Sequence, residues 1–239
     1  MEKVLGRSLN PADGNQFIGN RITGRGIHAT FARSGVIKDN VITEVTCGTG
    51  PGIWLIAFSN FWQVTGNDVS HIADSGDTHF MQEGIRLGTA SNYNVVARNK
   101  VHDLGDDGRG IATDVDASFN TFEYNTVTNV PIGYNDEMSG WGNIWRKNTV
   151  TNFTILGFGF RMKDRVLKVP SKDTSTHYSI VADNVATAGR KGAAGLSIGA
   201  IAGSKFSGNT FGKINLGSYV SGYWAKQGNT WNGTTKPPS

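Results

Sequence analysis

Charged and amide side chains that could support acid–base chemistry recur at short intervals in the middle of the chain. They are Arg86, Asp114, Asp116, Asn135, Glu137, Arg161 and Lys163. A carboxyl group can transfer a proton or activate water, and an arginine or lysine can bind an anion or stabilise developing negative charge. The pattern indicates general acid–base chemistry on an anionic substrate, if the fold brings these residues to one surface. The alternative is a lattice of solvated ion pairs with a structural role only.

Two reactions fit this set. In β-elimination on a uronate polymer, a base removes the proton next to the carboxylate, Arg161 or Lys163 stabilises the resulting charge, and Arg86 binds the substrate carboxylate. In hydrolysis, one carboxyl group protonates the leaving oxygen and another activates water, and the three carboxylates named above are the candidates. The density of cations slightly favours elimination.

Two loop segments add further candidates beside the same predicted surface. Residues 70–84 (SHIADSGDTHFMQEG) contain His79, and residues 102–110 (HDLGDDGRG) contain His102 and Arg109. Together with Asn135 and an exposed Trp54, which could stack on a sugar ring, these are candidates for substrate binding. The reactions above require no cofactor. Calcium is an alternative, because it prefers oxygen ligands and the loops carry several carboxylates. Its candidate ligands are Asp74, Asp77, Asp106 and Asp107.

A repeating fold must position these residues. An asparagine recurs along the chain with a nonpolar residue two positions later, and in all but the last repeat a nonpolar residue three positions earlier. The asparagines are Asn20, Asn40, Asn67, Asn99, Asn125, Asn148, Asn184, Asn209 and Asn229. Self-similarity at a period of roughly 20–50 residues is typical of stacked architectures. The flanking segments alternate apolar and polar residues, as strands with one buried face do. A third strand-like segment usually opens with glycine and an apolar residue, as in Gly84-Ile85.

Strands that repeat in this way can stack in parallel, about 4.8 Å apart, each pairing with its equivalent one coil away. The period-two pattern places the recurrent asparagine inside, where its amide needs hydrogen-bond partners. Asparagines that bond to one another from coil to coil supply them. The sequence therefore predicts a single all-β domain over residues 1–239. Its coils, about eight to nine in number, span roughly residues 14–232 and carry an inward asparagine ladder.

This pattern resembles the right-handed parallel β-helix of the pectate-lyase-like superfamily, and the resemblance covers nearly the whole chain. The superfamily includes polysaccharide lyases, polygalacturonase-like hydrolases, uronan epimerases, pectin esterases and phage tailspikes, so the fold alone does not identify a reaction. Arg161-Met162-Lys163 is similar to the Arg-Ile-Lys signature with which polygalacturonases grip the substrate carboxylate. However, the Gly-His-Gly motif of that family and the Asp-Pro-His motif of mannuronan epimerases are both absent. No catalytic role is therefore transferred from either family.

Aligning the third strands on their first apolar residue predicts which side chains face outward. We take Ile85, Ile111 and Ile132 as equivalent positions in successive coils. On this alignment Glu137 lies beside Asp116, about 5 Å away at Cα. The outward set then includes Trp54, Arg86, Asp114, Asp116, Asn135, Glu137, Arg161 and Lys163, and the flanking coils carry apolar or small residues there.

The composition limits the classes of partner that the chain is expected to bind. The chain has 23 Lys and Arg against 19 Asp and Glu, and the net charge of +4 suits an acidic polysaccharide. Nucleic acid is not expected, because no dense basic run with interleaved aromatics is present. A membrane span is not expected either, because no run of roughly 18 apolar residues exists. Cys47 is the only cysteine, which excludes an intrachain disulfide. The N-terminus lacks the apolar stretch of a secretory signal.

The sequence therefore predicts an enzyme that cleaves an acidic, uronate-containing polysaccharide, with elimination slightly preferred over hydrolysis. Such a protein would be extracellular or virion-associated. The alternative is a tailspike-like or adhesin-like module that binds surface glycan without strong catalysis. Because the repeat begins and ends abruptly, open strand edges are expected. A homotrimer or a larger parent chain would cover them.

Overall fold

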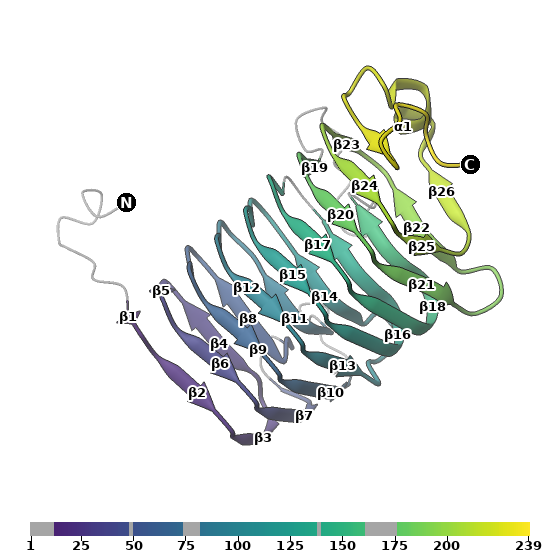
Figure 1. Ribbon diagram of the computed structural model, residues 1–239. Helices are drawn as coiled ribbons and strands as arrows, with labels where there is room; N and C mark the ends of the chain where they lie inside the picture. The colour runs from purple at the N-terminus through teal and green to yellow at the C-terminus, as the bar shows by residue number, and fades with distance from the viewer. Residues whose placement is uncertain (1–11, 48–49, 74–81, 138–139, 161–175) are drawn as a thin grey trace.

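The computed structural model describes residues 12–47, 50–73, 82–137, 140–160 and 176–239. Figure 1 shows the strands stacked in parallel along one axis to form an elongated β-helix. The predicted all-β parallel β-helix is therefore confirmed. Each coil contributes up to three strands, and each strand pairs in parallel with its equivalents in the neighbouring coils. None of the described helical residues form a segment long and apolar enough to span a membrane.

The first strand of each coil belongs to one nine-stranded sheet, which we call the first-strand sheet. Its members are β2 (Gln16–Ile18), β6 (Val36–Lys38), β9 (Gln63–Thr65), β12 (Val95–Ala97), β15 (Thr121–Glu123), β17 (Ile144–Arg146), β20 (Ile180–Ala182), β24 (Lys205–Ser207) and β27 (Thr230–Trp231).

A larger sheet bends at a corner in every coil, and it contains the second and third strands. The second strands are β3 (Arg21–Gly24), β7 (Val41–Val45), β10 (Asp68–Ile72), β13 (Lys100–His102), β21 (Val185–Ala188) and β25 (Thr210–Phe211). The third strands are β4 (Ile27–Thr30), β8 (Ile53–Ile56), β11 (Glu83–Leu87), β14 (Arg109–Thr113), β22 (Ala194–Ile198) and β26 (Ile214–Leu216). In two coils both strands merge into one, β16 (Thr126–Asp136) and β18 (Thr149–Phe160). Short pairs complete the fold, β1 (Ala12–Asp13) with β5 (Ala32–Arg33) and β19 (Thr176–His177) with β23 (Ile201–Ala202).

The core consists of columns of inward side chains, one from each strand of each coil. Aliphatic residues such as Val64 and Val96 predominate toward the N-terminal end, where Trp62 is also buried, and aromatic residues predominate further along. Phe122 stacks on Trp145 with ring centroids 3.9 Å apart, and Tyr134 lies inside the helix, buried like the rest of the core. Like residues recur in each column because equivalent positions contact each other directly one coil apart.

The recurrent asparagines are hydrogen-bonded to one another. Asn40 Nδ2 donates to Asn67 Oδ1 at 2.9 Å, Asn67 Nδ2 donates to Asn99 Oδ1 at 2.9 Å, and each of these oxygens also accepts a backbone N–H of the preceding asparagine. The same bonding continues from Asn99 to Asn125 and on to Asn209. These bonds satisfy amides that would otherwise be buried without partners.

A second set of buried asparagines, which the sequence analysis missed, lies at the bend between the third strands and the next first strands. Asn94 Nδ2 donates to Asn120 Oδ1 at 3.1 Å, and Asn120 Nδ2 donates to Asn143 Oδ1 at 3.4 Å. Serines, Ser179 and Ser204, occupy the equivalent position in two later coils, where the Ser179 backbone N–H donates to Ser204 Oγ at 2.9 Å. The mixture of residue types at this bend hides its repeat in the sequence.

The alignment of the fifth coil on Ile132 is wrong by two residues. Tyr134, not Ile132, pairs with Ile111. The corner before each third strand sets the alignment, because it leaves no room for a side chain. A Cβ on Gly133 would lie 2.6 Å from the Gly157 carbonyl oxygen. Glycine is required there, so Gly133-Tyr134 is the true counterpart of the Gly-Ile pairs elsewhere.

The C-terminal end of the stack is covered by a short helix that the sequence did not predict, α1 (Ser218–Tyr223). Val220 and the adjoining Trp224 are buried, and Trp224 packs against Phe206 with ring centroids 5.8 Å apart. Trp231 stacks on the same Phe206 ring at 5.5 Å. Figure 1 shows this segment folded over the last coils.

Candidate functional site

Three carboxylates and two arginines meet on the outward side of the third strands, where we call them the charged cluster. Glu83 and Arg86 lie on β11, Arg109 begins β14, and Asp114 and Glu137 follow the last residues of β14 and β16. Arg86 donates through Nη2 to Asp114 Oδ2 at 2.6 Å and through Nη1 to Glu83 Oε1. Arg109 Nη1 lies 3.0 Å from Glu83 Oε1 and 2.8 Å from Glu137 Oε1. Glu83 therefore joins the two arginines, and three neighbouring coils contribute to one network.

Burial gives the cluster unusual electrostatics. The side chain of Glu137 is 4% exposed, and loss of hydration raises its pKa to about 7, even though Arg109 and Arg86 act in the opposite direction. Negative charge on Glu83 and Asp114 adds to the rise. For Arg86, burial alone would lower the pKa, but the surrounding carboxylates raise it above its ordinary value. Arg86 therefore stays charged, while Glu137 can gain or lose a proton near neutral pH.

A row of polar atoms extends the cluster along the helix axis. Trp54, Arg86 and Asn135 occupy equivalent outward positions in their coils. In the coil between Arg86 and Asn135, the small Ala112 holds this position. Asn135 Nδ2 donates to Glu137 Oε1 at 3.3 Å. Among the described residues, no hydrogen-bond partner reaches Trp54 Nε1, Arg86 Nε or Asn135 Oδ1, although these atoms are buried. Buried polar atoms are normally paired, so these three atoms lack the partners that their burial would require.

The structure brings together five of the predicted site residues and separates others. Arg86, Arg109, Asp114, Asn135 and Glu137 lie in or beside the charged cluster, with Trp54 in the neighbouring coil. The corrected register places Glu137 beside Asp114, since the Glu137 backbone N–H donates to the Thr113 carbonyl at 3.3 Å. Asp116 does not join them, because the chain has left the strand and turned there, with φ +57° and an exposed side chain.

Several predicted residues lie outside the described part of the chain. They are Asp74, Asp77, His79, Arg161 and Lys163.

Glu83 was not predicted as a site residue. It is 1% exposed, and its role depends on Arg109 in the next coil, with which it is in register. One signal was available in the sequence. Glu83 directly precedes Gly84 as Arg109 directly precedes Gly110, so the two residues must be neighbours at the corner. Charges of opposite sign at equivalent positions of adjacent coils predict an ion pair.

His102 lies apart from the charged cluster, on the outward side of the second strands. Its Nε2 is 2.8 Å from Asp68 Oδ1, and its Nδ1 is 2.6 Å from Asp103 Oδ2. Hydrogen bonding to His102, and then to Asn129, lowers the pKa of Asp103. With both ring nitrogens within hydrogen-bonding distance of carboxylates, His102 belongs to a separate polar group.

Asp106 and Asp107, two of the predicted calcium ligands, are exposed in the loop between β13 and β14. Throughout the described residues, no three His, Cys, Asp or Glu side chains are arranged to hold a metal ion.

No protein-family model and no curated protein sequence matches the chain. The chain is similar to solved structures of the periplasmic alginate epimerase AlgG, with 17% identity and a TM-score of 0.59 over 90% of this chain and 52% of that one. A mutant of the same epimerase matches with a TM-score of 0.56 and the same identity and coverage. This chain thus spans about half the length of the structures it matches. Identity at this level shows the fold alone, and the fold is the parallel β-helix predicted from the asparagine repeat.

Proposed function

We propose that the chain is an enzyme that cleaves an acidic, uronate-containing polysaccharide by general acid–base chemistry at the charged cluster. The observation that carries this proposal is Glu137, a buried carboxyl group with its pKa raised to about 7 beside two arginines on the outward face of the third strands. A proton donor is most effective when its pKa lies near the working pH. Clusters of groups with perturbed pKa values are frequent at functional sites.

The charge balance of the cluster suits an anionic substrate. With Glu137 protonated, the remaining carboxylates, Glu83 and Asp114, balance the two arginines. A substrate carboxylate near Arg86 adds negative charge, which further disfavours ionisation of Glu137. Glu137 therefore keeps its proton when substrate binds, as a general acid must. The unpartnered Arg86 Nε and Trp54 Nε1 supply donors for the substrate.

Asp114 complements Glu137. It is the most exposed carboxylate of the cluster, at 17%, and Arg86 fixes its position. In elimination, Asp114 removes the proton next to the substrate carboxylate, a carbon–carbon double bond forms, the glycosidic C–O bond breaks, and the leaving oxygen takes the Glu137 proton. In hydrolysis, Asp114 instead removes a proton from the attacking water. Elimination remains the preferred reaction in this proposal because the sequence carries two further cations, Arg161 and Lys163, which lie outside the described residues. A polymer of this kind would be met outside the cell or on a virion.

The test is incubation with alginate, polygalacturonate and a neutral glucan, following reducing ends and the ultraviolet absorbance of unsaturated product together. Both signals indicate elimination, and reducing ends alone indicate hydrolysis. Glu137→Gln is expected to lower turnover by about 10²-fold or more, because it cannot donate the proton. EDTA is expected to leave activity unchanged. A loss of activity in EDTA would instead assign calcium to the loop that contains Asp106.

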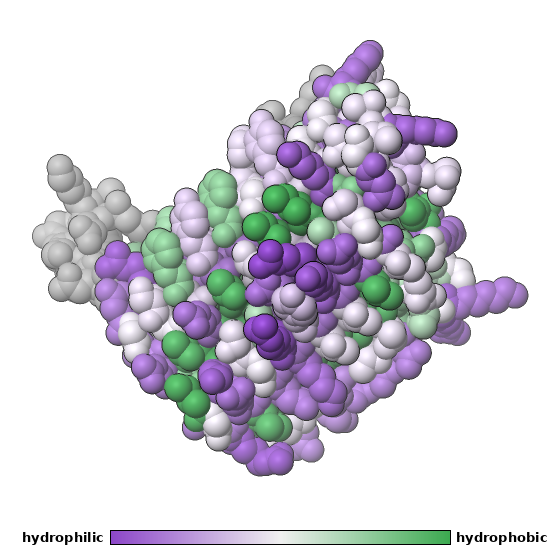
Figure 2. Space-filling view, in the orientation of Figure 1, coloured by the Kyte–Doolittle hydropathy of each residue, from purple (hydrophilic) through white to green (hydrophobic). Residues whose placement is uncertain are grey.

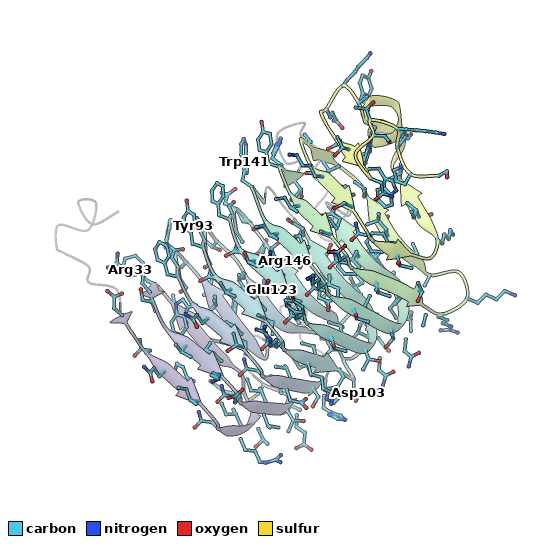
Figure 3. The ribbon with its side chains drawn as sticks, viewed as in Figure 1. Arg33, Tyr93, Asp103, Glu123, Trp141 and Arg146 are labelled. Carbon is cyan, nitrogen blue, oxygen red and sulfur yellow. The ribbon has the colours of Figure 1, made fainter. Side chains whose placement is uncertain are left out.

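Glu123→Gln is the matched control. Glu123 is also paired with an arginine, with Arg146 Nη2 2.6 Å from Glu123 Oε2, but on the first-strand sheet, where Figure 3 labels both residues. This variant should retain turnover. Equal losses in the two variants would contradict the role of Glu137.

A second candidate function is a glycan-binding module without catalysis. This candidate is favoured because both arginines are already paired with carboxylates, and a purely structural lattice of ion pairs would be arranged in the same way. Such a module would bind the polymers but yield neither product, and Glu137→Gln would leave its binding unchanged. It would assemble as a trimer or act within a larger chain, which light scattering of the intact protein would show.

A further inference from the structure

A column of exposed aromatic rings runs along the edge between the third strands and the following first strands. Phe61, Tyr93 and Phe119 are 54%, 52% and 48% exposed. Their rings lie nearly parallel, with centroids 5.4 Å apart for Phe61 and Tyr93 and 5.2 Å apart for Tyr93 and Phe119. Figure 2 shows apolar side chains at the surface along this edge, and Figure 3 shows Tyr93 and Trp141 projecting from it, on the opposite side from Asp103.

The column occupies the same coils as the charged cluster. Phe61 follows β8, which carries Trp54, and Tyr93 follows β11, which carries Glu83 and Arg86. The next coil repeats this arrangement, since Phe119 follows β14 and the cluster residues on it. In the following coil Gly142 holds the equivalent position, and the preceding Trp141, which follows β16, is 44% exposed. A polymer lying along the helix axis on the third strands would therefore have the column beside it over the whole length of the cluster.

The turn itself does not require aromatic residues. Phe61, Tyr93 and Phe119 have φ values of +61°, +59° and +57°, a left-handed conformation that is uncommon for bulky residues. The backbone hydrogen bonds place Gly142 and Gly203 at the equivalent position of other coils, with φ values of +63° and +62°. Glycine meets the demands of this turn without strain.

The way the rings stack indicates what they contact. Each inner ring face is covered by the next ring, so the exposed part of the column consists largely of ring edges. These edges carry the positive part of the aromatic quadrupole and favour electronegative groups over cations. Carboxylate and ring oxygens of an acidic glycan meet these requirements.

We propose that this aromatic column is a second binding surface for the acidic polysaccharide, which holds a segment of the polymer beside the charged cluster. The inference rests on the proposed function. Two linked contacts bind a long chain more tightly than either does alone, provided that one chain can reach both. The column should therefore matter for long polymers and not for short oligosaccharides that occupy only the cluster.

The test compares column variants with a matched control on another turn. Asparagine tolerates the left-handed conformation, so Tyr93→Asn and Phe119→Asn remove the rings while retaining the turn. The control is Tyr124→Asn. Tyr124 is 44% exposed with φ +56°, but it lies on a different turn, within 5.2 Å of Arg98 and 5.3 Å of Lys147. Tyr93→Phe keeps the ring, and thermal unfolding checks that each variant is folded.

Binding is measured with long alginate and polygalacturonate, with their short oligosaccharides and with a neutral glucan, in the Glu137→Gln background. The double variant Tyr93→Asn/Phe119→Asn is expected to lose about tenfold or more in affinity for the long acidic chains. Affinity for oligosaccharides should stay within about twofold, and Tyr124→Asn and Tyr93→Phe should behave as the parent protein does.

Unchanged polymer affinity in the folded double variant would overturn the proposal and leave the rings a structural stack. Equal binding of the neutral glucan would overturn the assignment to an acidic polymer. If light scattering shows that the rings hold a second copy of the chain, and polymer affinity is unchanged, the proposal also fails. If the column variants lose binding while wild-type protein cleaves nothing, the enzymatic function fails and the column stands. If wild-type protein binds none of the polymers, both fail.

Discussion

Glu137 retains a proton near neutral pH because it is buried on an outward face where carboxylates outnumber arginines. Its pKa is about 7 in the folded chain against an ordinary value of 4.5. A carboxyl group with a raised pKa stabilises the fold fully below the ordinary value, and that contribution is lost as the pH rises through the folded value. Glu137 therefore makes the folded state less stable on the alkaline side of pH 7.

Glu137→Gln should remove this dependence. Between about pH 4.5 and about pH 8, the wild type should lose on the order of 3 kcal/mol in its free energy of unfolding relative to the variant. Some pH dependence should remain in the variant, because burial also raises the pKa of Asp136. Urea unfolding at the two pH values measures the difference. A wild type and a variant with the same pH dependence would show that Glu137 is hydrated in solution.

Glu83 acts on Glu137 through charge, since the two carboxylates share Arg109. Glu83→Gln removes a negative charge that raises the pKa of Glu137, so that pKa should fall below about 7. An NMR titration of the Glu137 carboxyl carbon reads this shift directly, and the alkaline limb of any activity profile should move to lower pH with it. Glu123→Gln on the first-strand sheet is the control and should leave the titration in place. An upward shift in Glu83→Gln would contradict the network.

At the scale of the elements, the glycine corners set which side chains face outward. A Cβ on Gly110 would lie 2.5 Å from the Gly133 carbonyl oxygen and 2.5 Å from Val127 Cγ1. The carbonyl cannot move away without disturbing the pairing of β14 with β16. Gly110→Ala should therefore lower the free energy of unfolding by about 2 kcal/mol or more.

Gly222→Ala is the control for this substitution. Gly222 lies in α1, and nothing is within 4 Å of the position a Cβ would take. Alanine is preferred over glycine in a helix by about 1 kcal/mol, so stability should be unchanged or slightly higher. Urea midpoints of the two variants test the argument. Equal effects would mean that the corner tolerates a side chain and does not fix the register.

The architecture could be predicted from the sequence because inward residues must match from coil to coil, as Asn99 and Val101 do with their equivalents. The site could be predicted only in part. In β16 no loop separates the second strand from the third, so Ile132 was aligned in place of Tyr134. Glu83 was missed because its burial depends on a cation from another coil. Repeats reveal what is constant along the stack, and ion pairs depend on how each coil departs from it.

At the scale of the whole molecule, a stack of parallel strands needs its ends covered, because an open end exposes core side chains and unpaired backbone groups. The C-terminal end is covered by the segment around α1. Trp224 is 1% exposed and packs on Phe206, the inward residue of a late coil. This segment stabilises the end of the stack by burying apolar surface.

Trp224→Ala should therefore affect both stability and association. Loss of a buried tryptophan costs about 3–5 kcal/mol. Exposure of Phe206 and the strands beside it should also lead to association at high protein concentration, since uncovered ends of such stacks pair with other chains. Thermal unfolding and light scattering over a range of concentrations measure the two effects. The neighbouring Tyr223, 47% exposed, provides the control, and Tyr223→Ala should remain close to wild type in both. If Trp224→Ala is destabilised but stays monodisperse, the segment supports the last coils without shielding their edges.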